Sequence, residues 1–425
     1  MDKLQKARSV ISEADAGMAD LFVRRMEAVA QVAEYKKERG LPIFDGARER
    51  EVLEKGAARV SDPALQPHYV RFLQNTMEVS KAYQRQLLTD GGALRMELGE
   101  RSYDIVIRRG CLNEAGRLLN LDRKVCIVTD EGVPEQYAQA VAQQCKDPVT
   151  VTVDAGEETK TLNTVAAICR AMAERGFTRG DCVVAVGGGM VGDLAGFAAA
   201  SYMRGVDFYN IPTTLLAQVD SSIGGKTGVN LDGVKNIVGA FHQPKGVLID
   251  PDTLGTLSPR LYAEGMAEAV KMALTSDAAL FEKLERGDLP VEQVLEGALT
   301  IKKAIVEQDE RESGLRKLLN FGHTIGHGVE SAAAGSLHHG ECVALGMLPM
   351  CSGEVRARLL PLLEKWGLPT VCSLDKDAIW QAMQHDKKSN SSGFSAVFVE
   401  KPGQGAVKQV SFEEMKAILE GAWQA

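Results

Sequence analysis

The chain has 425 residues, a formal net charge of -8 at pH 7 and a pI near 5.6. This length is enough for two or three domains with buried cores, and the acidic balance argues against a general binder of nucleic acid or acidic membranes. No apolar run reaches the roughly 20 residues of a membrane helix, and the N-terminus is too polar for a secretory signal. The eight cysteines never occur as C-x-x-C, which is typical of reduced, packed thiols. We therefore expect a cytoplasmic protein whose partners are small molecules.

The first 90 residues have apolar side chains at three- and four-residue steps, which predicts helices. Gly40 and Pro42 end the first helix, and an acid followed by proline at Asp62-Pro63 begins the third. The predicted helices span 2–39, 45–60 and 62–88, and TDGG at 89–92 is predicted to be a linker.

From there the sequence alternates apolar, strand-like runs with helical stretches, which predicts a parallel α/β domain. The strands are expected at 124–130, 148–153, 181–186, 207–212 and 245–250. After about Thr253 the pattern becomes mainly helical. The fold class is thus multidomain: an all-α domain at 1–90, an α/β domain at 91–253 and a mainly helical domain at 254–425.

Charged residues on the first helix indicate a ligand and a second chain. Arg25 and Lys36 are 11 residues apart, about three turns, so they share one face. Arg8 lies 17 residues before Arg25, roughly 25 Å away along a helix, which no small metabolite spans. If all three serve one site, Arg8 comes from an antiparallel second copy, and a homodimer follows.

This N-terminal pattern resembles the all-helical class of chorismate mutases. The resemblance rests on Arg8, Arg25, Lys36, Asp45, Arg48, Glu49, Ser80 and Gln84. It implies conversion of chorismate to prephenate without a cofactor, with the first arginine donated by the partner subunit. By similarity the three arginines hold carboxylates, Asp45 and Glu49 engage the ring hydroxyl region, and Lys36 with Gln84 donate hydrogen bonds to the ether oxygen. The alternative is a helical arm that serves only dimerisation or sensing.

A glycine-rich turn in DCVVAVGGGMVGDLAGF contains G-x-G-x-x-G at Gly187, Gly189 and Gly192, after a strand and before a helix. Phosphate binding at that helix N-terminus is expected. The next strand ends in Thr213 and Thr214 instead of an acid, so ordinary Rossmann topology is not expected.

Four of the seven histidines lie in NFGHTIGHGVESAAAGSLHHGE, residues 320–341. His323 and His327 have the four-residue spacing of a zinc protease helix, but Thr324 stands where such an enzyme needs its glutamate. A metalloprotease is therefore not expected, and the spacing alone does not decide which histidines bind metal.

Seven motifs together closely resemble 3-dehydroquinate synthase over residues of about 95 to 400. They are GGGMVGD, ASYMRG, VDSSIGGKTGVN, KNIVGAF, AEGMAEAVK, DERESGLRKLLNFGHTIGH and LHHGE. The resemblance implies NAD and one Zn²⁺, with Co²⁺ as a substitute, and conversion of 3-deoxy-D-arabino-heptulosonate 7-phosphate to 3-dehydroquinate and phosphate. In that family NAD oxidises an alcohol, phosphate leaves, NADH reduces the product, the ring opens and an aldol step closes the carbocycle.

The same resemblance implies the site residues. The implied metal ligands are Glu268, His323 and His339, and His338 has no assigned role. Implied substrate residues are Asp220, Lys226, Asn236, Lys271, Lys302, Glu312, Arg316, Asn320 and His327, with Arg204 reaching a neighbouring subunit and Lys387 or Lys388 closing over the phosphate. Lys302 and Arg316 suit the carboxylate, whereas Lys226, Asn236, Asn320 and His327 suit the phosphate. Implied NAD contacts are Asp130, Glu157, Lys160, Gly189, Gly192, Asp193, Thr213, Thr214, Lys226, Lys235, Thr253 and Thr256.

Two rival activities are a metal-dependent polyol dehydrogenase and a related sugar phosphate cyclase. The first would not require the full set of polar residues around the metal, and the second tends to alter several of them. Because the two implied reactions are not consecutive, substrate transfer does not explain the fusion, and shared regulation is our hypothesis.

Overall fold

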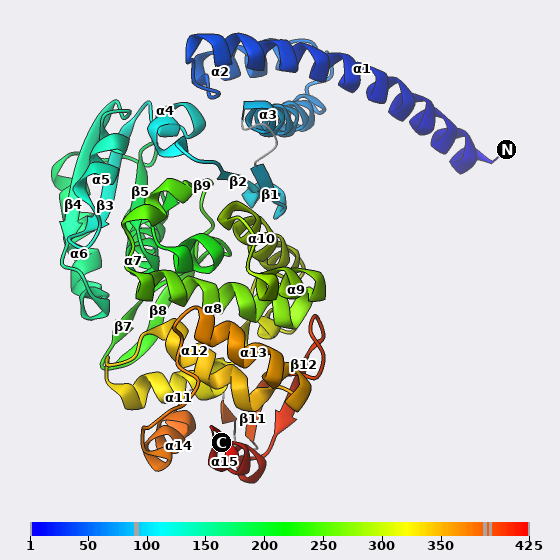
Figure 1. The fold of residues 1–425 in the computed structure, drawn as a ribbon. Coiled ribbons are helices and arrows are strands. Elements are labelled where there is room, and N and C mark those ends of the chain that lie inside the picture. The colour runs from blue at the N-terminus through cyan, green and yellow to red at the C-terminus, as the bar shows by residue number, and fades with distance from the viewer. Residues whose placement is uncertain (1, 89–92, 386–388, 391–392, 424–425) are drawn as a thin grey trace.

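The structure is a computed structural model that describes residues 2–88, 93–385, 389–390 and 393–423. A helical domain with a projecting first helix lies at one end, an α/β domain in the middle and a mainly helical domain at the other end (Figure 1). The predicted linker at 89–92 and the two candidate lysines Lys387 and Lys388 lie outside the described residues.

The N-terminal domain has the three predicted helices: α1 (Lys3–Arg39), α2 (Gly46–Ala57) and α3 (Gln66–Leu88). Asp2 and Asp45 cap the first two helices, and Gly40 ends α1 in the left-handed conformation. The third helix begins four residues later than the sequence predicts. Asp62 instead closes a turn, because its carboxylate accepts from the Ala64 N–H at 2.9 Å and its carbonyl from the Leu65 N–H at 3.1 Å.

The central domain is built on a seven-stranded sheet in the order β1-β2-β9-β6-β5-β3-β4. All neighbours are parallel except the β1–β2 pair. The five predicted strands are present, and β1 and β2 were not predicted. The bounds are β1 Ala93–Met96, β2 Tyr103–Ile107, β3 Lys124–Asp130, β4 Asp147–Val153, β5 Cys182–Gly187, β6 Asp207–Pro212 and β9 Gly246–Ile249.

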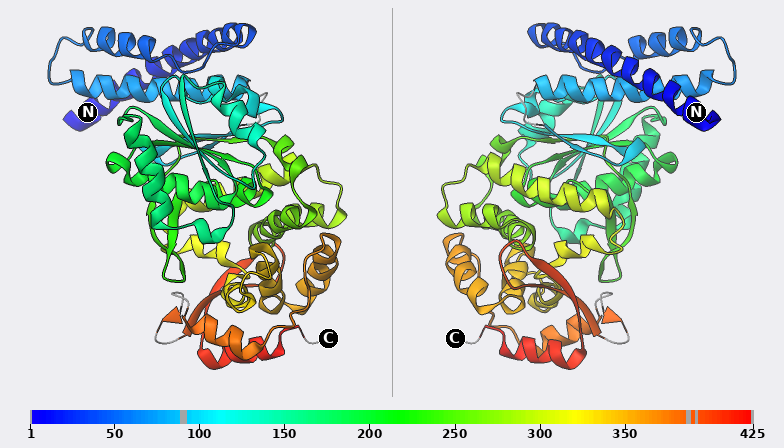
Figure 2. Two further views of the ribbon diagram at one scale, coloured as in Figure 1. Left: turned by 90° about the vertical axis from the view of Figure 1, so that its left-hand side faces the viewer. Right: turned by 90° about the vertical axis from the view of Figure 1, so that its right-hand side faces the viewer.

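Helices cover the sheet, and a separate two-stranded hairpin that was not predicted packs against α7 and extends toward the C-terminal domain (Figure 2). The helices are α4 (Ala115–Leu118), α5 (Glu135–Ala142), α6 (Leu162–Glu174) and α7 (Gly189–Ser201), and the hairpin consists of β7 (Lys226–Leu231) and β8 (Val234–Phe241). Lysine, asparagine and glycine interrupt the apolar residues of the hairpin, and β8 is mostly exposed, so its sequence lacks the signal of a buried strand.

The C-terminal domain is mainly helical, as predicted, and also has a small antiparallel sheet of three strands. Its elements are α8 (Pro259–Ser276), α9 (Ala278–Arg286), α10 (Val291–Gln308), α11 (His323–Ala333), α12 (His339–Met347), α13 (Gly353–Lys365), α14 (Lys376–His385), β10 (Ser389–Asn390), β11 (Gly393–Val399), β12 (Gly405–Val410) and α15 (Phe412–Gly421). Helix α8 is its centre, because every residue from Ala263 to Thr275 is buried.

One hydrophobic core joins the sheet to the helical domain. Ile105 and Ile249 of the sheet belong to the same cluster of buried residues as Met272 of α8 and Leu345 of α12. Packing therefore continues across the predicted boundary near residue 253, and α8 lies where the two domains meet.

The N-terminal domain is also packed onto the α/β domain. Ile43, in the loop between α1 and α2, and Leu88, at the end of α3, are buried in one cluster with Leu118 of α4. The Ile43 N–H donates to the Arg117 carbonyl at 3.2 Å, and Arg85 of α3 forms an ion pair with the nearly buried Asp104 of β2. These contacts form a junction that does not depend on the linker.

No helix among the described residues has both the length and the apolar character that a membrane span needs.

We predict that Ile43→Ala weakens this junction. Ile43 is 3% exposed, so the change removes buried methyl groups and should lower the free energy of unfolding by about 2–4 kcal/mol. Urea unfolding followed by circular dichroism measures the effect. The matched control is Ile237→Ala, since Ile237 is 43% exposed on β8, and equal losses in the two variants would contradict the prediction.

Candidate active sites

The first candidate site begins where the strand order of the sheet reverses. β4 lies on one side of β3, and β5, β6 and β9 follow on the other, so the reversal is between β3 and β5. Ligands of open α/β sheets bind outside the carboxyl ends of the strands at this point. Asp130 ends β3 there, and the glycine turn follows β5.

The glycine turn lets other side chains pack closely against the first turn of α7, whose first residues stay half-buried. A Cβ atom added at Gly189 would lie 2.9 Å from the Ser221 hydroxyl, and one at Gly192 would lie 3.3 Å from the Asn210 amide, so a larger side chain would push these groups away. The backbone N–H groups of a helix start can then reach a phosphate. This placement agrees with the expected role of the turn.

Lys160 connects two polar side chains beside that turn. Its ammonium forms an ion pair with Asp193 at 2.5 Å and donates to the Asn236 amide oxygen at 2.6 Å. Burial raises the pKa of Asp193, and the nearby Lys160 opposes that rise. Asn236 was expected near the phosphate of the substrate with Lys226, but the structure places it with this nucleotide-side group.

The other implied nucleotide residues are held in different ways. Glu157 accepts from the Asn230 amide at 2.9 Å, and Asp130, whose pKa burial raises, accepts from the Gly132 N–H at 2.7 Å. Thr213 is buried, and the Thr214 hydroxyl accepts from the Ala217 N–H at 3.2 Å.

Thr253 and Thr256 are engaged in structural hydrogen bonds. The Thr253 hydroxyl donates to the Asp250 carbonyl at 2.8 Å and is itself buried, while the Thr256 hydroxyl donates to the Thr253 carbonyl at 3.1 Å. Lys235, expected at the nucleotide, instead forms an ion pair with Glu330 of α11 at 2.7 Å. These three residues are thus held by partners other than Lys160.

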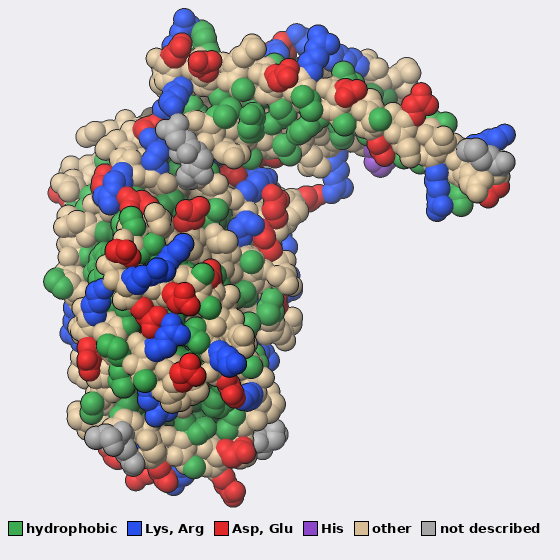
Figure 3. Space-filling model, turned by 45° about the vertical axis from the view of Figure 1, so that its right-hand side comes forward, with side chains coloured by type: hydrophobic (Ala, Val, Ile, Leu, Met, Phe, Trp, Pro, Cys, Tyr) green, Lys and Arg blue, Asp and Glu red, His purple; other side chains and the backbone are tan. Residues whose placement is uncertain are grey.

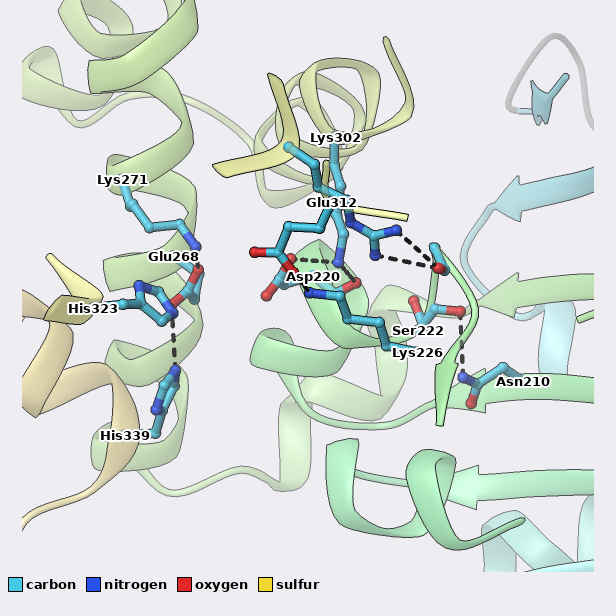
Figure 4. Close-up of polar contacts among 12 residues, drawn as sticks. Asn210, Asp220, Ser222, Lys226, Glu268, Lys271, Lys302, Glu312, His323 and His339 are labelled. Carbon is cyan, nitrogen blue, oxygen red and sulfur yellow. Dashed lines mark hydrogen bonds and ion pairs between the residues drawn. The ribbon is translucent and has the colours of Figure 1, made fainter. Parts of the chain in front are cut away.

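The three implied metal ligands come together from three helices, although they are far apart in sequence. Glu268 of α8, His323 of α11 and His339 of α12 offer ligand atoms that all lie within 4.8 Å of one another (Figure 4). The Glu268 Oε1 atom is 3.7 Å from His323 Nε2 and 3.6 Å from His339 Nε2. These separations are too long for good hydrogen bonds and near the roughly 3.3 Å between two ligands of a tetrahedral zinc ion.

The surroundings of these side chains fit a cation. Glu268 is completely buried, and neither of its carboxylate oxygens has a hydrogen-bond partner among the described residues, although Lys271 forms an ion pair with it. His323 Nδ1 lies 3.1 Å from the Phe321 carbonyl, and His339 Nδ1 lies 3.2 Å from the Glu330 carboxylate. These acceptors favour a proton on Nδ1, which leaves both Nε2 lone pairs directed toward Glu268.

Glu330 was not predicted from the sequence. It lies on α11 three residues after His327 and holds both His339 and Lys235. Burial opposes its ionisation, but His339 and Lys235 outweigh that effect and lower its pKa. Its position three residues after His327 on the same helix was the sequence signal that could have identified it. The His327 ring is 5.2 Å from that of His323 and 6.0 Å from that of His339, so His327 borders the ligand set.

A group of charged residues lies beside the metal ligands, on the side toward the sheet (Figure 4). The Lys302 ammonium of α10 forms an ion pair with Asp220 at 2.5 Å and donates to the Asp220 carbonyl at 2.6 Å. Burial opposes ionisation of Asp220, but Lys302 and Lys271 outweigh it and lower the pKa of the carboxyl. Burial lowers the pKa of Lys302, and Asp220 opposes that change.

Glu312 connects two more of the implied residues. It forms an ion pair with Lys226 and accepts from the Asn320 amide at 2.5 Å. Glu312 has a positive φ of 61°, a conformation rare for residues other than glycine, asparagine and aspartate, which the surrounding contacts must stabilise.

Arg316 is nearly inaccessible, and its guanidinium donates to backbone carbonyls. It reaches the Gly224 carbonyl at 3.2 Å and the Glu310 carbonyl at 2.5 Å. It therefore fixes the glycine turn that immediately precedes Lys226, in addition to carrying positive charge.

A second candidate site lies in the N-terminal domain. Arg25 of α1 donates to the hydroxyl of the buried Ser80 on α3, and the Lys36 ammonium donates to the Ile43 carbonyl at 2.6 Å. Burial lowers the pKa of both cations. Gln84, one turn after Ser80, is buried, and its amide oxygen has no hydrogen-bond partner among the described residues. Donors from two helices thus face one region.

The charged residues at the start of α2 differ in whether they face the site or the surface. Glu49 points to α3 and forms an ion pair with Lys81 at 2.9 Å, whereas Arg48 pairs with Glu51 on the exposed side at 2.6 Å. Asp45 caps α2 through the Arg48 N–H at 2.9 Å. Lys81, one residue after Ser80, was not assigned to the site from the sequence. Its side chain is more deeply buried than that of Arg48.

Arg8 and Arg204 are exposed and stay outside both sites of this chain. Arg8 lies on the projecting part of α1, 17 residues before Arg25 on the same continuous helix. Arg204 follows α7 with a φ of 69°, in the left-handed region.

We predict that Lys302→Met destabilises the protein in a pH-dependent way. The folded pKa of Asp220 lies below its unfolded value of about 3.9, so the pair contributes stability above that pH and loses it as pH falls through the folded pKa. Without Lys302 the half-buried carboxylate lacks its main cation, and the loss should be about 2–3 kcal/mol at pH 7 and smaller below pH 4.

Urea unfolding at several pH values measures this difference. The matched control is Lys303→Met, which removes a partly exposed ion pair with Glu307 on the same helix and should cost less than about 1 kcal/mol. A loss in Lys302→Met that does not change with pH would contradict the assignment.

Solved structures provide one comparison. The chain matches a 2-deoxy-scyllo-inosose synthase complexed with carbaglucose-6-phosphate, NAD⁺ and Co²⁺ at 27% identity and a TM-score of 0.71, covering 78% of this chain and 100% of the other. It matches the 2-epi-5-epi-valiolone synthase of Streptomyces hygroscopicus subsp. jinggangensis, with NAD⁺ and Zn²⁺ bound, at 30% identity and a TM-score of 0.70, covering 76% and 97%. A glycerol dehydrogenase from Schizosaccharomyces pombe, at 15% identity and a TM-score of 0.52, shares the fold.

Sequence families provide the other comparison. The family model for chorismate mutase type II matches residues 7–85, and those for the N-terminal and C-terminal parts of 3-dehydroquinate synthase match residues 150–264 and 265–389. The 3-dehydroquinate synthase of Streptococcus suis is 42% identical, and that of Streptococcus pneumoniae is 43% identical; each match covers 77% of this chain and 99% of the relative. The chain belongs to the 3-dehydroquinate synthase family and carries a type II chorismate mutase domain at its N-terminus.

Proposed function

We propose that the chain is a bifunctional enzyme of aromatic amino acid biosynthesis. Its larger part converts 3-deoxy-D-arabino-heptulosonate 7-phosphate to 3-dehydroquinate and phosphate, and its N-terminal domain converts chorismate to prephenate. The observation that carries the first activity is the buried set of Glu268, His323 and His339 beside the charged group of Asp220, Lys226 and Lys302. The matches to curated 3-dehydroquinate synthases support the substrate.

NAD and a divalent metal ion are the cofactors of the synthase. When bound, NAD accepts and returns a hydride, and the metal ion increases the acidity of substrate hydroxyls. Glu268, His323 and His339 would hold the metal, with Glu330 orienting His339. The glycine turn at Gly189 and Gly192 and the group around Lys160 would hold the nucleotide, together with Asp130, Glu157, Asp193, Thr213 and Thr214.

The charged group suits a substrate with one carboxylate and one phosphate. Lys302 and Lys226 each have a carboxylate partner, so the group is nearly neutral without substrate and its cations are already oriented. We assign Lys302 to the substrate carboxylate and Lys226, Asn320 and His327 to the phosphate. Arg316 would act mainly by fixing the turn before Lys226.

Asp220 is placed to orient a substrate hydroxyl. Its lowered pKa keeps it ionised at neutral pH, and it lies on the side of the charged group toward the metal ligands. A carboxylate in that state is a weak base, so it would act as a hydrogen-bond acceptor and as a negative charge that holds Lys302 in place.

The two rivals are less well supported. The polyol dehydrogenase among the solved structures shares the fold at 15% identity, and the related cyclases are 27% and 30% identical, below the 42% of the curated synthase from Streptococcus suis.

The mutase reaction requires a compact substrate conformer and donors at the breaking ether bond, with no cofactor. Lys36 and Gln84 supply donors from opposite helices, and Arg25 supplies a cation for a carboxylate. Asp45 and Glu49 lie close enough to Lys36 to affect its pKa, and by similarity they would contact the ring hydroxyl region, with Lys81 paired to Glu49.

We expect Arg25→Ala and His323→Ala to separate the two activities. Removing Arg25 deletes a carboxylate contact of the mutase and should lower its kcat/KM by at least about 100-fold, since charged contacts of this kind contribute about 3 kcal/mol or more. Removing His323 should abolish only the synthase activity.

Both variants are assayed as full chains for chorismate consumption and for phosphate release. Each serves as the control of the other. Loss of synthase activity in Arg25→Ala, or its retention in His323→Ala, would disprove the assignment of the two sites.

We propose further that two chains pair through α1. Apolar side chains line this projecting helix and are at least 45% exposed, and Figure 3 shows hydrophobic residues along the same domain. They are Leu4, Val10, Ile11, Met18, Leu21, Phe22, Val23, Val32 and Tyr35. A second copy lying antiparallel would cover them and bring its Arg8 near Arg25.

Mixing Arg8→Ala and Arg25→Ala chains tests this pairing. Each variant alone should lack mutase activity, but a mixed dimer has one site with both arginines intact. Random exchange should restore about one quarter of the wild-type sites. The mutase activity of the two variants after they are refolded together measures the restored sites. If this activity does not exceed that of the separately refolded variants, the site is not shared between two chains.

The junction with the synthase supports shared regulation as the reason for the fusion. The Lys36 ammonium donates to the Ile43 carbonyl, and the Ile43 N–H donates to the Arg117 carbonyl of the α/β domain, so one residue, Ile43, contacts both halves. A ligand that moves Lys36 would therefore act on the synthase through this loop.

We expect prephenate to change the synthase rate of the full chain. Phosphate release at increasing prephenate measures the effect, and Arg25→Ala, which weakens prephenate binding, should shift the response to higher concentrations. A rate that is indifferent to prephenate would contradict the hypothesis.

A further inference from the structure

The position of one metal ligand depends on how a helix begins. His339 is the first residue of α12, so no earlier turn of that helix supports it. Its position therefore depends on the residues that cap the helix. Its fellow ligand Glu268 lies deep within α8. A metal site tolerates only a few tenths of an ångström in ligand position, so the start of α12 must be fixed relative to α8.

Three side chains of α8 face the start of α12 at successive turns. Arg260, Glu264 and Glu268 are four residues apart and share one face of the helix. Glu268 faces His339, and Glu264 forms a short hydrogen bond with His338 Nδ1.

Arg260 makes the third of these contacts. It binds both oxygens of Glu341, at 2.8 and 2.7 Å, and Glu341 accepts the backbone N–H of His338 at 2.7 Å. The same arginine donates to the Ser336 carbonyl at 2.9 Å, so both sides of the cap are tied to α8.

The backbones of the two helices also touch at this level. A Cβ atom added at Gly340 would lie 2.5 Å from the Glu264 Cα atom and 2.7 Å from its carbonyl oxygen. Gly340 thus allows a close approach that the polar contacts of His338 and Glu341 hold in register.

From this arrangement we infer that His338 and Glu264 are positioning residues for the metal, fixing the distance between Glu268 and His339. Neither is a ligand of the metal. The Glu264 side chain is almost fully buried, and an ionised carboxylate is only an acceptor, so His338 donates from Nδ1. Breaking the pair leaves a buried polar group without its partner and lets the cap of α12 move away from α8. This inference rests on the proposed metal site.

The variants His338→Leu, Glu264→Leu and His338→Asn test it in the full chain. Asparagine carries its amide nitrogen on the same carbon as histidine carries Nδ1, so it can still donate to Glu264. We measure Co²⁺ affinity by competition with a chelator and the visible absorption spectrum of the bound ion. The leucine variants should bind Co²⁺ about tenfold more weakly with an altered spectrum, whereas His338→Asn should recover most of both.

Glu285→Gln is the matched control, because Glu285 forms an ion pair with Arg358 between α9 and α13 that holds no ligand. Wild-type affinity and spectrum in both leucine variants would overturn the inference, as would failure of His338→Asn to recover them or an equal loss in Glu285→Gln. If the wild-type chain itself binds no Co²⁺, the metal site is wrong, which is a separate outcome.

Discussion

The buried charge of Glu268 is the constraint on which the larger part of this structure depends. Glu268 lies at the centre of α8, a helix buried over thirteen consecutive residues, Ala263 to Thr275. An ionised carboxylate in such a place is costly unless cations compensate its charge. Lys271 supplies one cation, and the two imidazoles prepare the place of another. The helices that carry those groups must therefore pack around α8, as the contacts of α8 with α12 show.

Much of this organisation could be predicted from residues. The five central strands are strongly apolar, and the helical N-terminal domain has clear periodicity and caps, so both were found. The strands β1 and β2 were missed because they are short and each includes a charged residue, Arg95 in β1 and Asp104 in β2. The β7–β8 hairpin was missed because lysine, asparagine and glycine interrupt its apolar residues. The third helix was predicted to begin at Asp62, but Asp62 closes a turn and the helix begins at Gln66.

The candidate sites were predicted to different depths. The motifs identified the metal ligands, whose convergence from three helices the structure then showed. Residues that act through other residues were harder to find, because no motif marks Glu330 behind His339 or Lys81 beside Glu49. Spacing also cannot tell which partners a residue of a hairpin will find, so the contacts of Asn236 with Lys160 and of Lys235 with Glu330 were not predicted.

The packing of Ile43 and Leu88 into the α/β domain has a consequence for the chain between the two enzymes. Since the domains are already docked, the covalent connection from Leu88 to Ala93 only closes a loop between two neighbouring points. Doubling the length of such a loop costs only about 0.6 kcal/mol in chain entropy. Insertions there should leave the mutase seated as before, so natural relatives could vary this segment freely while keeping the docking surface.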